Sequence, residues 1–162
     1  MRNLPWLGLS LLVLGLDQLG KHWAQRALTG RVLRVADWFN LVLAYNEGAA
    51  FSFLSEAGGW QRAFFIAVTV VVVPALLVWL LRLPPRRPVE AAALALVIGG
   101  ALGNLVDRVR LGRVVDFIDW HLGSWHWPAF NLADAAITAG AVLLLARMVL
   151  HGGSGQGHGS SR

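Results

Sequence analysis

Two aspartates in the C-terminal third of the chain have the surroundings that acid–base chemistry requires. Asp116 is flanked by two apolar residues on each side and has no charged neighbour, so burial there would raise the pKa of its carboxyl. Asp134 stands near the start of an apolar segment, three residues after Asn131. If the chain between them loops back, the two carboxyls meet and share a proton. One then activates water while the other polarises a peptide carbonyl, so the pair predicts peptide hydrolysis without a covalent intermediate.

Each aspartate also has a structural interpretation. Asp116 could be an ordinary solvated loop carboxylate. Asp134 could match the positive end of a helix dipole, with Asn131 as the N-cap residue of that helix. Taken singly, neither aspartate decides between structure and catalysis.

Other hydrolytic chemistries lack the residues that they need. The chain contains no cysteine, which excludes disulfides, thiolate metal sites and cysteine nucleophiles. His22, His121 and His126 stand beside no recognisable nucleophile motif, and the sequence has no H-E-x-x-H zinc motif and no Gly-rich phosphate loop. An enzyme acting on lipid headgroups would normally show such signatures. We interpret His121 and His126, in a tryptophan-rich loop, as interfacial residues.

Two further clusters place polar groups in apolar surroundings. Asp17 and Lys21 are four residues apart with the acid first, the favourable order for an ion pair on a helix. They are either a paired charge near a helix end or a brace for a site or a lipid headgroup. Asn104, Asp107 and Arg108 share one helix face. For Asp107 we favour an internal polar network that holds helices together.

Composition places these polar groups in a membrane protein. The chain is 56% hydrophobic and only 14% charged, whereas soluble domains carry about 25% charged residues. Four segments approach the roughly 20 apolar residues of a spanning helix. They run over residues 4–23, 63–83, 91–109 and 132–150. The first could instead be a signal peptide, but charged residues follow its apolar core and no A-x-A cleavage site does, so an uncleaved span is expected.

The long connection over residues 24–62 predicts extended structure outside or at the edge of the bilayer. Residues 32–45 are rich in β-branched and aromatic types, which predicts two or three short strands. The run Asn46 to Phe51 contains Asn and Gly, which is typical of a turn. Residues 1–151 are expected to form a single membrane domain, followed by a Gly/Ser-rich disordered tail over 152–162.

Charge identifies the expected partners better than it identifies the orientation. The net charge is +5, but the basic residues are scattered among apolar runs and form no compact patch with stacking aromatics. This pattern disfavours nucleic acid and favours membrane lipid headgroups. Basic residues divide almost evenly between the two sides of a four-span topology. Their density at Arg82 to Arg87 favours a cytoplasmic position for that turn.

Read together, the motifs resemble those of the bacterial lipoprotein signal peptidases, also called signal peptidase II. The family pattern is an Asp with a Lys four later, then N-x-G-x-A-F, G-N-x-x-D-R, V-V-D-F and F-N-x-A-D. All five are present in order, at Asp17 and Lys21, Asn46 to Phe51, Gly103 to Arg108, Val114 to Phe117 and Phe130 to Asp134. Each motif is weak alone, but the ordered set is specific and spans nearly the whole chain apart from the tail.

The resemblance implies an all-α membrane protein with four transmembrane helices, a small periplasmic β-cradle and a short periplasmic helix. It implies a multi-pass protein of the bacterial inner membrane, with the active site at the periplasmic face and both termini cytoplasmic. The substrate would be a diacylglyceryl-modified prolipoprotein, cleaved just before the modified lipobox cysteine. Neither a metal nor an organic cofactor is implied, and a monomer is expected.

The resemblance also assigns roles to matching positions. Asp116 and Asp134 would be the catalytic pair of an aspartic endopeptidase. The remaining matched residues would support the site or orient substrate. They are Asn46, Asn104, Arg108 and Asn131, with Asp17, Lys21 and Asp107. A small transporter or a membrane scaffold is the rival class, and it would not require the two aspartates to lie close together.

Overall fold

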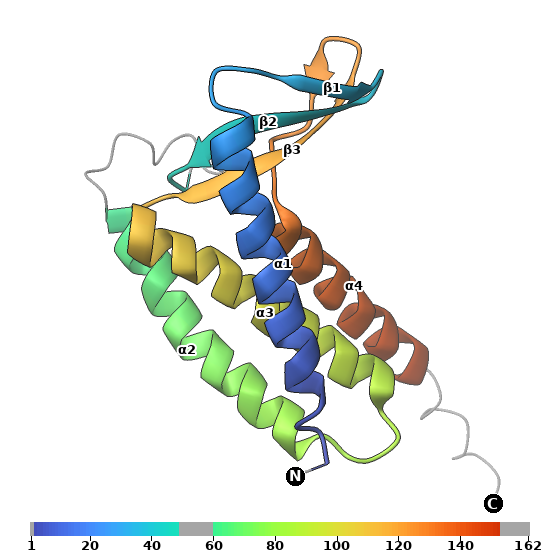
Figure 1. Cartoon of the computed structure of the whole chain (residues 1–162). Coiled ribbons are helices and arrows are strands. Elements are labelled where there is room, and N and C mark those ends of the chain that lie inside the picture. The colour runs from blue at the N-terminus through green and yellow to red at the C-terminus, as the bar shows by residue number, and fades with distance from the viewer. Residues whose placement is uncertain (1, 49–59, 153–162) are drawn as a thin grey trace, which may run out of the picture.

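The computed structural model describes residues 2–48 and 60–152 as a bundle of long helices with a small sheet across one end (Figure 1). The helices are α1 (Trp6–Ala27), α2 (Trp60–Arg82), α3 (Pro88–Leu111) and α4 (Leu132–Gly152). The strands are β1 (Leu33–Ala36), β2 (Phe39–Asn46), β3 (Val114–Leu122) and β4 (Trp125–His126). The expected tail beyond residue 152 and the second half of the 46–51 run lie outside the described residues.

Three of the four expected spans are confirmed by length and composition. In the described part of the chain, α2, α3 and α4 are long and apolar enough to cross a membrane. The helix α1 is 22 residues long but is not among them, and it carries Asp17, Lys21 and Arg26. The described part of the chain is therefore mostly helical with three helices that could span a membrane, whereas a fourth span remains a prediction.

The helix α3 is the centre of the bundle, since it packs against each of the other three helices. Small residues permit this packing. A Cβ added at Gly100 would clash with the backbone oxygen of Ala133 in α4, and one added at Gly103 would lie 2.6 Å from Asp17 Oδ2 in α1. Membrane helices associate closely where such small residues remove the side-chain barrier.

The sheet is antiparallel in the order β1-β2-β3-β4. Of the two or three short strands predicted within residues 32–45, two are present, as β1 and β2. The interpretation of residues around His121 and His126 as a loop is wrong, because they pair with each other across β3 and β4. In the central pair, Ala44 of β2 lies opposite Asp116 of β3. A segment distant in sequence thus holds the strand that carries Asp116.

The sheet closes one end of the bundle, beyond the C-terminal ends of α1 and α3 and the N-terminal end of α4 (Figure 1). Gly112, with φ 78°, ends α3 in the left-handed conformation and allows the chain to turn directly into β3. The start of α1 and the end of α4 lie at the opposite end of the bundle. No short helix accompanies the four long ones within residues 2–48 and 60–152, so that feature also remains a prediction.

Candidate active site

Asp116 occupies a buried position on β3 and is 2% exposed. Asn131 Nδ2 donates to its Oδ1 over 2.6 Å, and the Asn46 side chain forms a second hydrogen bond with the carboxyl. Burial, together with the negative charge of Asp134, raises the pKa of Asp116 from 3.8 to about 6, because these effects outweigh the hydrogen bonds that favour the ionised form. The Asp116 carboxyl therefore keeps its proton to a higher pH than an ordinary aspartate does.

Asp134 lies in the first turn of α4 and is half-buried. Asn131 Oδ1 accepts the backbone N–H of Asp134 over 2.9 Å, and Asp134 Oδ2 accepts the backbone N–H of Asn131 over 3.3 Å. The N-cap prediction for Asn131 is confirmed, and the two residues cap the helix reciprocally. Asn104 Nδ2 donates to the other oxygen, Asp134 Oδ1, over 2.7 Å. Capping of α4 therefore uses Asp134 Oδ2, whereas Asp134 Oδ1 binds Asn104.

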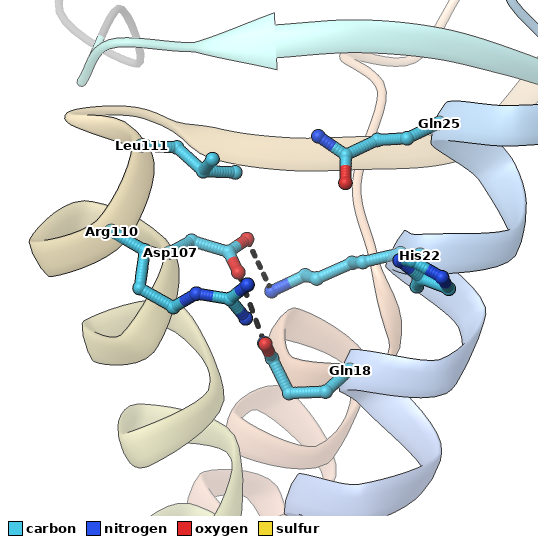
Figure 2. Close-up of a pocket in the computed structure, with 7 residues that line it drawn as sticks. Gln18, His22, Gln25, Asp107, Arg110 and Leu111 are labelled. Carbon is cyan, nitrogen blue, oxygen red and sulfur yellow. Dashed lines mark hydrogen bonds and ion pairs between the residues drawn. The ribbon is translucent and has the colours of Figure 1, made fainter.

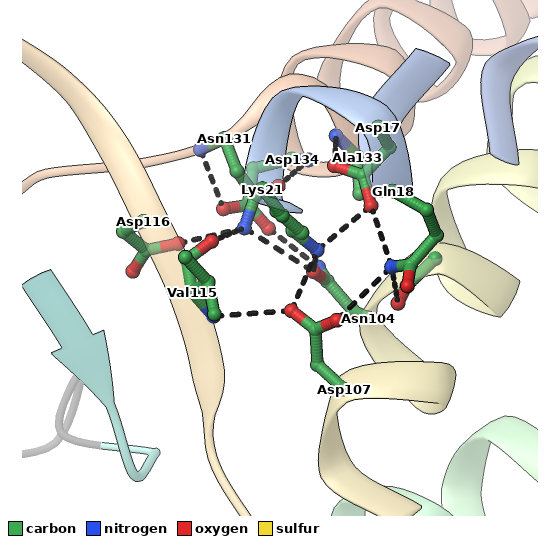
Figure 3. Close-up of polar contacts among 11 residues, drawn as sticks. Asp17, Gln18, Lys21, Asn104, Asp107, Val115, Asp116, Asn131, Ala133 and Asp134 are labelled. Atoms are coloured by element: carbon green, nitrogen blue, oxygen red, sulfur yellow. Dashed lines mark hydrogen bonds and ion pairs between the residues drawn. The ribbon is translucent and has the colours of Figure 1, made fainter. Parts of the chain in front are cut away.

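Asn131 joins the two aspartates and is completely buried. Its side-chain oxygen binds the backbone of Asp134 while its amide nitrogen binds the carboxylate of Asp116 (Figure 3). The same amide nitrogen lies 3.2 Å from Val115 O and 3.2 Å from Asn104 Oδ1. Asn131 therefore brings both carboxyls into one hydrogen-bonded group, with Asp116 close enough to experience the charge of Asp134.

A buried ion cluster lies beneath this group. The ion pair expected between Asp17 and Lys21 is present, with Lys21 Nζ 2.8 Å from Asp17 Oδ2, and Lys21 Nζ is also 3.0 Å from Asp107 Oδ2. All three residues are 3% exposed or less. Lys21 Nζ also donates to Asn104 Oδ1 over 2.9 Å. The cluster thus connects Lys21 of α1 to Asn104 of α3, whose amide nitrogen binds Asp134.

The fold brings most of the predicted residues together, and the geometry decides between two alternatives left open by the sequence. Asp107 belongs to an internal network, as favoured from its helix position. Gln18 was missed by the sequence reasoning. Its Nε2 lies within hydrogen-bond distance of Asp17 Oδ2, Gly103 O and Asp107 Oδ1. An amide beside Asp17 in an apolar helix was the signal that could have identified it.

The comparisons with known proteins agree with this arrangement. The family model described as Signal peptidase (SPase) II matches residues 9–150. The chain belongs to the signal peptidase II family. A protein named lipoprotein signal peptidase from Hydrogenovibrio crunogenus is 52% identical over 141 residues, covering 86% of this chain and 81% of the relative. One of the same name from Paraburkholderia phytofirmans is 53% identical over 142 residues, covering 87% and 82%.

Solved structures support the same placement. A structure described as a bacterial membrane enzyme superposes on this signal peptidase II with a TM-score of 0.80 at 28% identity, covering 98% of this chain and 94% of the other. A second structure so described gives 0.79 at 29% identity, covering 90% and 92%. The family recognised from five short motifs is therefore confirmed over most of the chain.

Arg108 and Asn46 both interact with the aspartates at positions 116 and 134. The Arg108 guanidinium carbon lies 4.7 Å from the centroid of the Phe65 ring in α2, within electrostatic range of Asp134, Asp107 and Asp116. Asn46 ends β2, and its Oδ1 accepts the backbone N–H of Gly48 over 2.8 Å. This turn confirms the predicted one over residues 46–48 and leaves the Asn46 amide nitrogen available to donate to Asp116.

A small polar pocket opens behind the ion cluster, between α1 and α3 (Figure 2). Its volume is about 40 Å³, which is room for about three water molecules. The pocket is lined by Gln18, Lys21, His22 and Gln25 of α1 and by Asp107, Arg110 and Leu111 of α3. Lys21 and Asp107 thus form part of the wall of this pocket, although each is 3% exposed or less.

The outer end of the sheet, which is the end of β3 beyond residue 118 together with β4, is lined mainly by aromatic rings. His126 Nδ1 lies 2.8 Å from Asp119 Oδ1, and the His126 ring stacks on that of His121 with centroids 4.9 Å apart. An apolar hollow of about 280 Å³ adjoins them. Tryptophans form most of its wall, namely Trp38, Trp120, Trp125 and Trp127. Within residues 2–48 and 60–152, no three His, Asp or Glu side chains are grouped so as to hold a metal ion.

Proposed function

We propose that this signal peptidase II is an aspartic endopeptidase that removes signal peptides from prolipoproteins, with Asp116 and Asp134 as its catalytic pair. The observation that carries the proposal is the Asn131 side chain, which binds Asp116 through its nitrogen and the Asp134 backbone through its oxygen. Two carboxyls held in this way share protons, as general acid–base hydrolysis requires. A transporter or scaffold would have no need of this arrangement.

The chemistry divides between the two carboxyls. Asp116, with its pKa near 6, holds the shared proton and polarises the scissile carbonyl. Asp134 lies at the positive end of the α4 dipole and accepts the Asn104 amide, so negative charge is favoured there. The Asp134 carboxylate takes a proton from water, and the resulting hydroxide adds to the carbonyl carbon. Breakdown of the tetrahedral intermediate then transfers a proton to the departing amine.

The site fits a substrate that is held at a membrane surface. Asp116 lies on β3 and Asp134 lies in the first turn of α4, and these two elements meet where the sheet adjoins the helix ends (Figure 1). We place this junction at the depth at which a lipid-anchored peptide enters the bilayer. We assign the substrate as a prolipoprotein whose lipobox cysteine carries diacylglycerol, with cleavage just before that cysteine. The amide and guanidinium groups of Asn46, Asn104 and Arg108 border the dyad and would position the peptide or support the carboxyls.

The proposed topology has four spans in the inner membrane. The exposed surface of α1 is rich in large apolar side chains, which supports contact with lipid along this helix. They include Leu11, Leu12, Leu16 and Leu19, each more than half exposed. Asp17 and Lys21 face inward and pair, so their charges do not oppose insertion as unpaired charges would. The sheet then lies on the periplasmic side and both termini are cytoplasmic. A monomer, surrounded by membrane lipids, contains every proposed site residue.

The experiment that tests this function is cleavage of a diacylglyceryl-modified prolipoprotein by purified enzyme in detergent or vesicles. Wild type should cleave this substrate and leave the unlipidated precursor intact. Asp116→Asn and Asp134→Asn should each lose essentially all activity while remaining folded. Asp37→Asn, which alters an exposed carboxyl in the β1–β2 turn, is the matched control and should retain wild-type activity. Activity in either dyad variant would contradict the assignment.

A further inference from the structure

The backbone N–H groups immediately before the two proposed catalytic aspartates are held in the same manner. The backbone N–H of Val115, which precedes Asp116, donates to Asp107 Oδ2 over 3.0 Å. The backbone N–H of Ala133, which precedes Asp134, donates to Asp17 Oδ1 over 2.9 Å. Two buried carboxylates from different helices thus each fix the main chain next to one member of the dyad (Figure 3).

Both carboxylates bind the same ammonium group. Lys21 Nζ lies 2.8 Å from Asp17 Oδ2, 3.0 Å from Asp107 Oδ2 and 2.9 Å from Asn104 Oδ1. A lysine ammonium has three N–H donors, so these three acceptors use all of them. Because Lys21 is only 2% exposed, bulk water has little access to its three N–H donors.

From this geometry we infer that Lys21 is a positioning residue that sets the separation of Asp116 and Asp134. It does so by binding the carboxylates of Asp107 and Asp17, which accept the backbone N–H groups that precede the two aspartates. The inference rests on the proposed function of the dyad. Lys21 contacts neither catalytic carboxyl directly. Through Asp107 it acts on the backbone of β3, and through Asp17 it acts on the backbone of the first turn of α4.

This clamp addresses a specific difficulty of the fold. Asp116 and Asp134 belong to separate elements, a strand and a helix, and each would otherwise move with its own element. Misplacing reacting groups by about 1 Å can reduce the rate by about 100-fold. Asn131 alone cannot fix the separation, because its own backbone is continuous with α4. The Lys21 cluster anchors both elements to α1 and α3 instead.

The pocket behind the cluster provides a way to test the clamp. Lys21 and Asp107 form part of its lining, and between α1 and α3 it has room for about three water molecules (Figure 2). If Lys21 is shortened to alanine, the space of its side chain joins this pocket. A small primary amine, such as ethylamine or propylamine, then has a route to the position of the missing ammonium.

In the first experiment, Lys21→Ala is assayed with the lipidated substrate over a range of pH and of added propylamine. We expect kcat to fall at least about 100-fold with KM little changed. The alkaline limb of the kcat profile should also move to higher pH, because the charge of Lys21 lowers the pKa of Asp116. Propylamine should restore kcat at least about 10-fold in a saturable manner and return the limb towards its wild-type position. Leu19→Ala, at a 68% exposed position of the same helix, should show neither loss nor rescue.

A second variant separates positioning from folding. Lys21→Ala leaves two buried carboxylates without their cation, which can unfold a protein. The double variant Lys21→Met with Asp17→Asn has the same net charge in the cluster as wild type, since one positive and one negative charge are removed together. It should melt near wild type in detergent, exchange the Val115 and Ala133 amide hydrogens faster, and still have low kcat.

The outcomes distinguish the clamp from the function on which it rests. Wild-type kcat in the folded double variant, or in Lys21→Ala without amine, would overturn the clamp while leaving the peptidase assignment intact. Low kcat in folded Lys21→Ala with no response to amine, and with unchanged amide exchange in the double variant, would also overturn it. Failure of the wild-type enzyme to cleave the lipidated substrate would instead overturn the proposed function.

Discussion

The inner and outer ends of β3 lie in opposite surroundings, although they belong to one nine-residue strand. At the inner end, Val114 to Phe117 are all buried, and Val115 and Asp116 each bind side chains from α3 or the start of α4. At the outer end, Trp120 is 50% exposed and Leu122 is 80% exposed. The inner end therefore buries Asp116 among apolar side chains, whereas the outer end exposes large apolar side chains.

The difference shows where the fold fixes its geometry. A buried polar group must be hydrogen-bonded, so every change near Asp116 leaves some donor or acceptor without its partner. An exposed aromatic ring depends on few hydrogen bonds within the protein. We therefore expect the sensitivity to substitution to fall steeply along the strand from Asp116 to Leu122, and the following variants test that expectation.

The largest effect is expected at Asn131. Asn131→Ala removes the amide donor to Asp116 and the acceptor for the Asp134 N–H. Loss of one such positioned donor in an active site typically reduces kcat by about 100-fold or more. Single-turnover cleavage of the lipidated substrate measures this change. A decrease of less than about 10-fold would show that the inner end is less constrained than its contacts indicate.

A clear effect on stability is expected at Gly103. The methyl of Gly103→Ala would lie 2.6 Å from Asp17 Oδ2, in a cluster that cannot move without breaking ion pairs. Overpacking of this kind destabilises by about 1–3 kcal/mol. Unfolding in detergent provides the measurement. The matched control is Gly15→Ala in α1, where nothing lies within 4 Å of the added methyl, so stability should be unchanged or slightly greater.

A smaller effect is expected on the pH dependence. Asp116 must be protonated in the proposed mechanism, so kcat/KM should fall as the pH rises through about 6. Because the raised pKa means that the folded state binds this proton more tightly than the unfolded chain, stability should also decline as the pH rises from 3.8 through about 6. Asn46→Ala removes a hydrogen bond that favours the ionised carboxyl, so the activity limb should move to higher pH.

The control for that shift is Asn40→Ala, on the same strand as Asn46. Asn40 Nδ2 donates to Asp119 at the outer end over 2.9 Å and does not contact Asp116. Its pH profile should match that of wild type. An equal shift in both variants would indicate a general change in the sheet and would remove the contrast between its two ends.

The smallest effect is expected at the outer end. Trp125 is 61% exposed, and its ring contacts that of Trp127 with centroids 6.0 Å apart. Trp125→Ala should change the free energy of unfolding by less than about 1 kcal/mol and leave kcat within about two-fold, since exposed substitutions are usually mild. A loss comparable to that of Asn131→Ala would contradict the proposed contrast between the two ends of the sheet.

Much of the fold could be predicted because it depends on local pattern. Apolar length located α2, α3 and α4, β-branched residues located β1 and β2, and spacing gave the Asp17–Lys21 pair. The strand β3 was not predicted, because Asp116 and Asp119 interrupt its apolar run and are buried only through partners elsewhere. The bridging role of Asn131 and the contacts of Gln18 likewise depend on segments more than ten residues away, which no local pattern encodes.

The order of the ion cluster along the chain has a consequence for biosynthesis. Lys21 finds its partner Asn104 83 residues later, and Asp17 finds the Ala133 amide 116 residues later. A growing chain therefore inserts α1 with only the internal Asp17–Lys21 pair to offset its charges, and the remaining contacts form when α3 and then α4 arrive. Because Asp134 emerges after every other proposed site residue, the nascent protein has no complete dyad until its last helix is made.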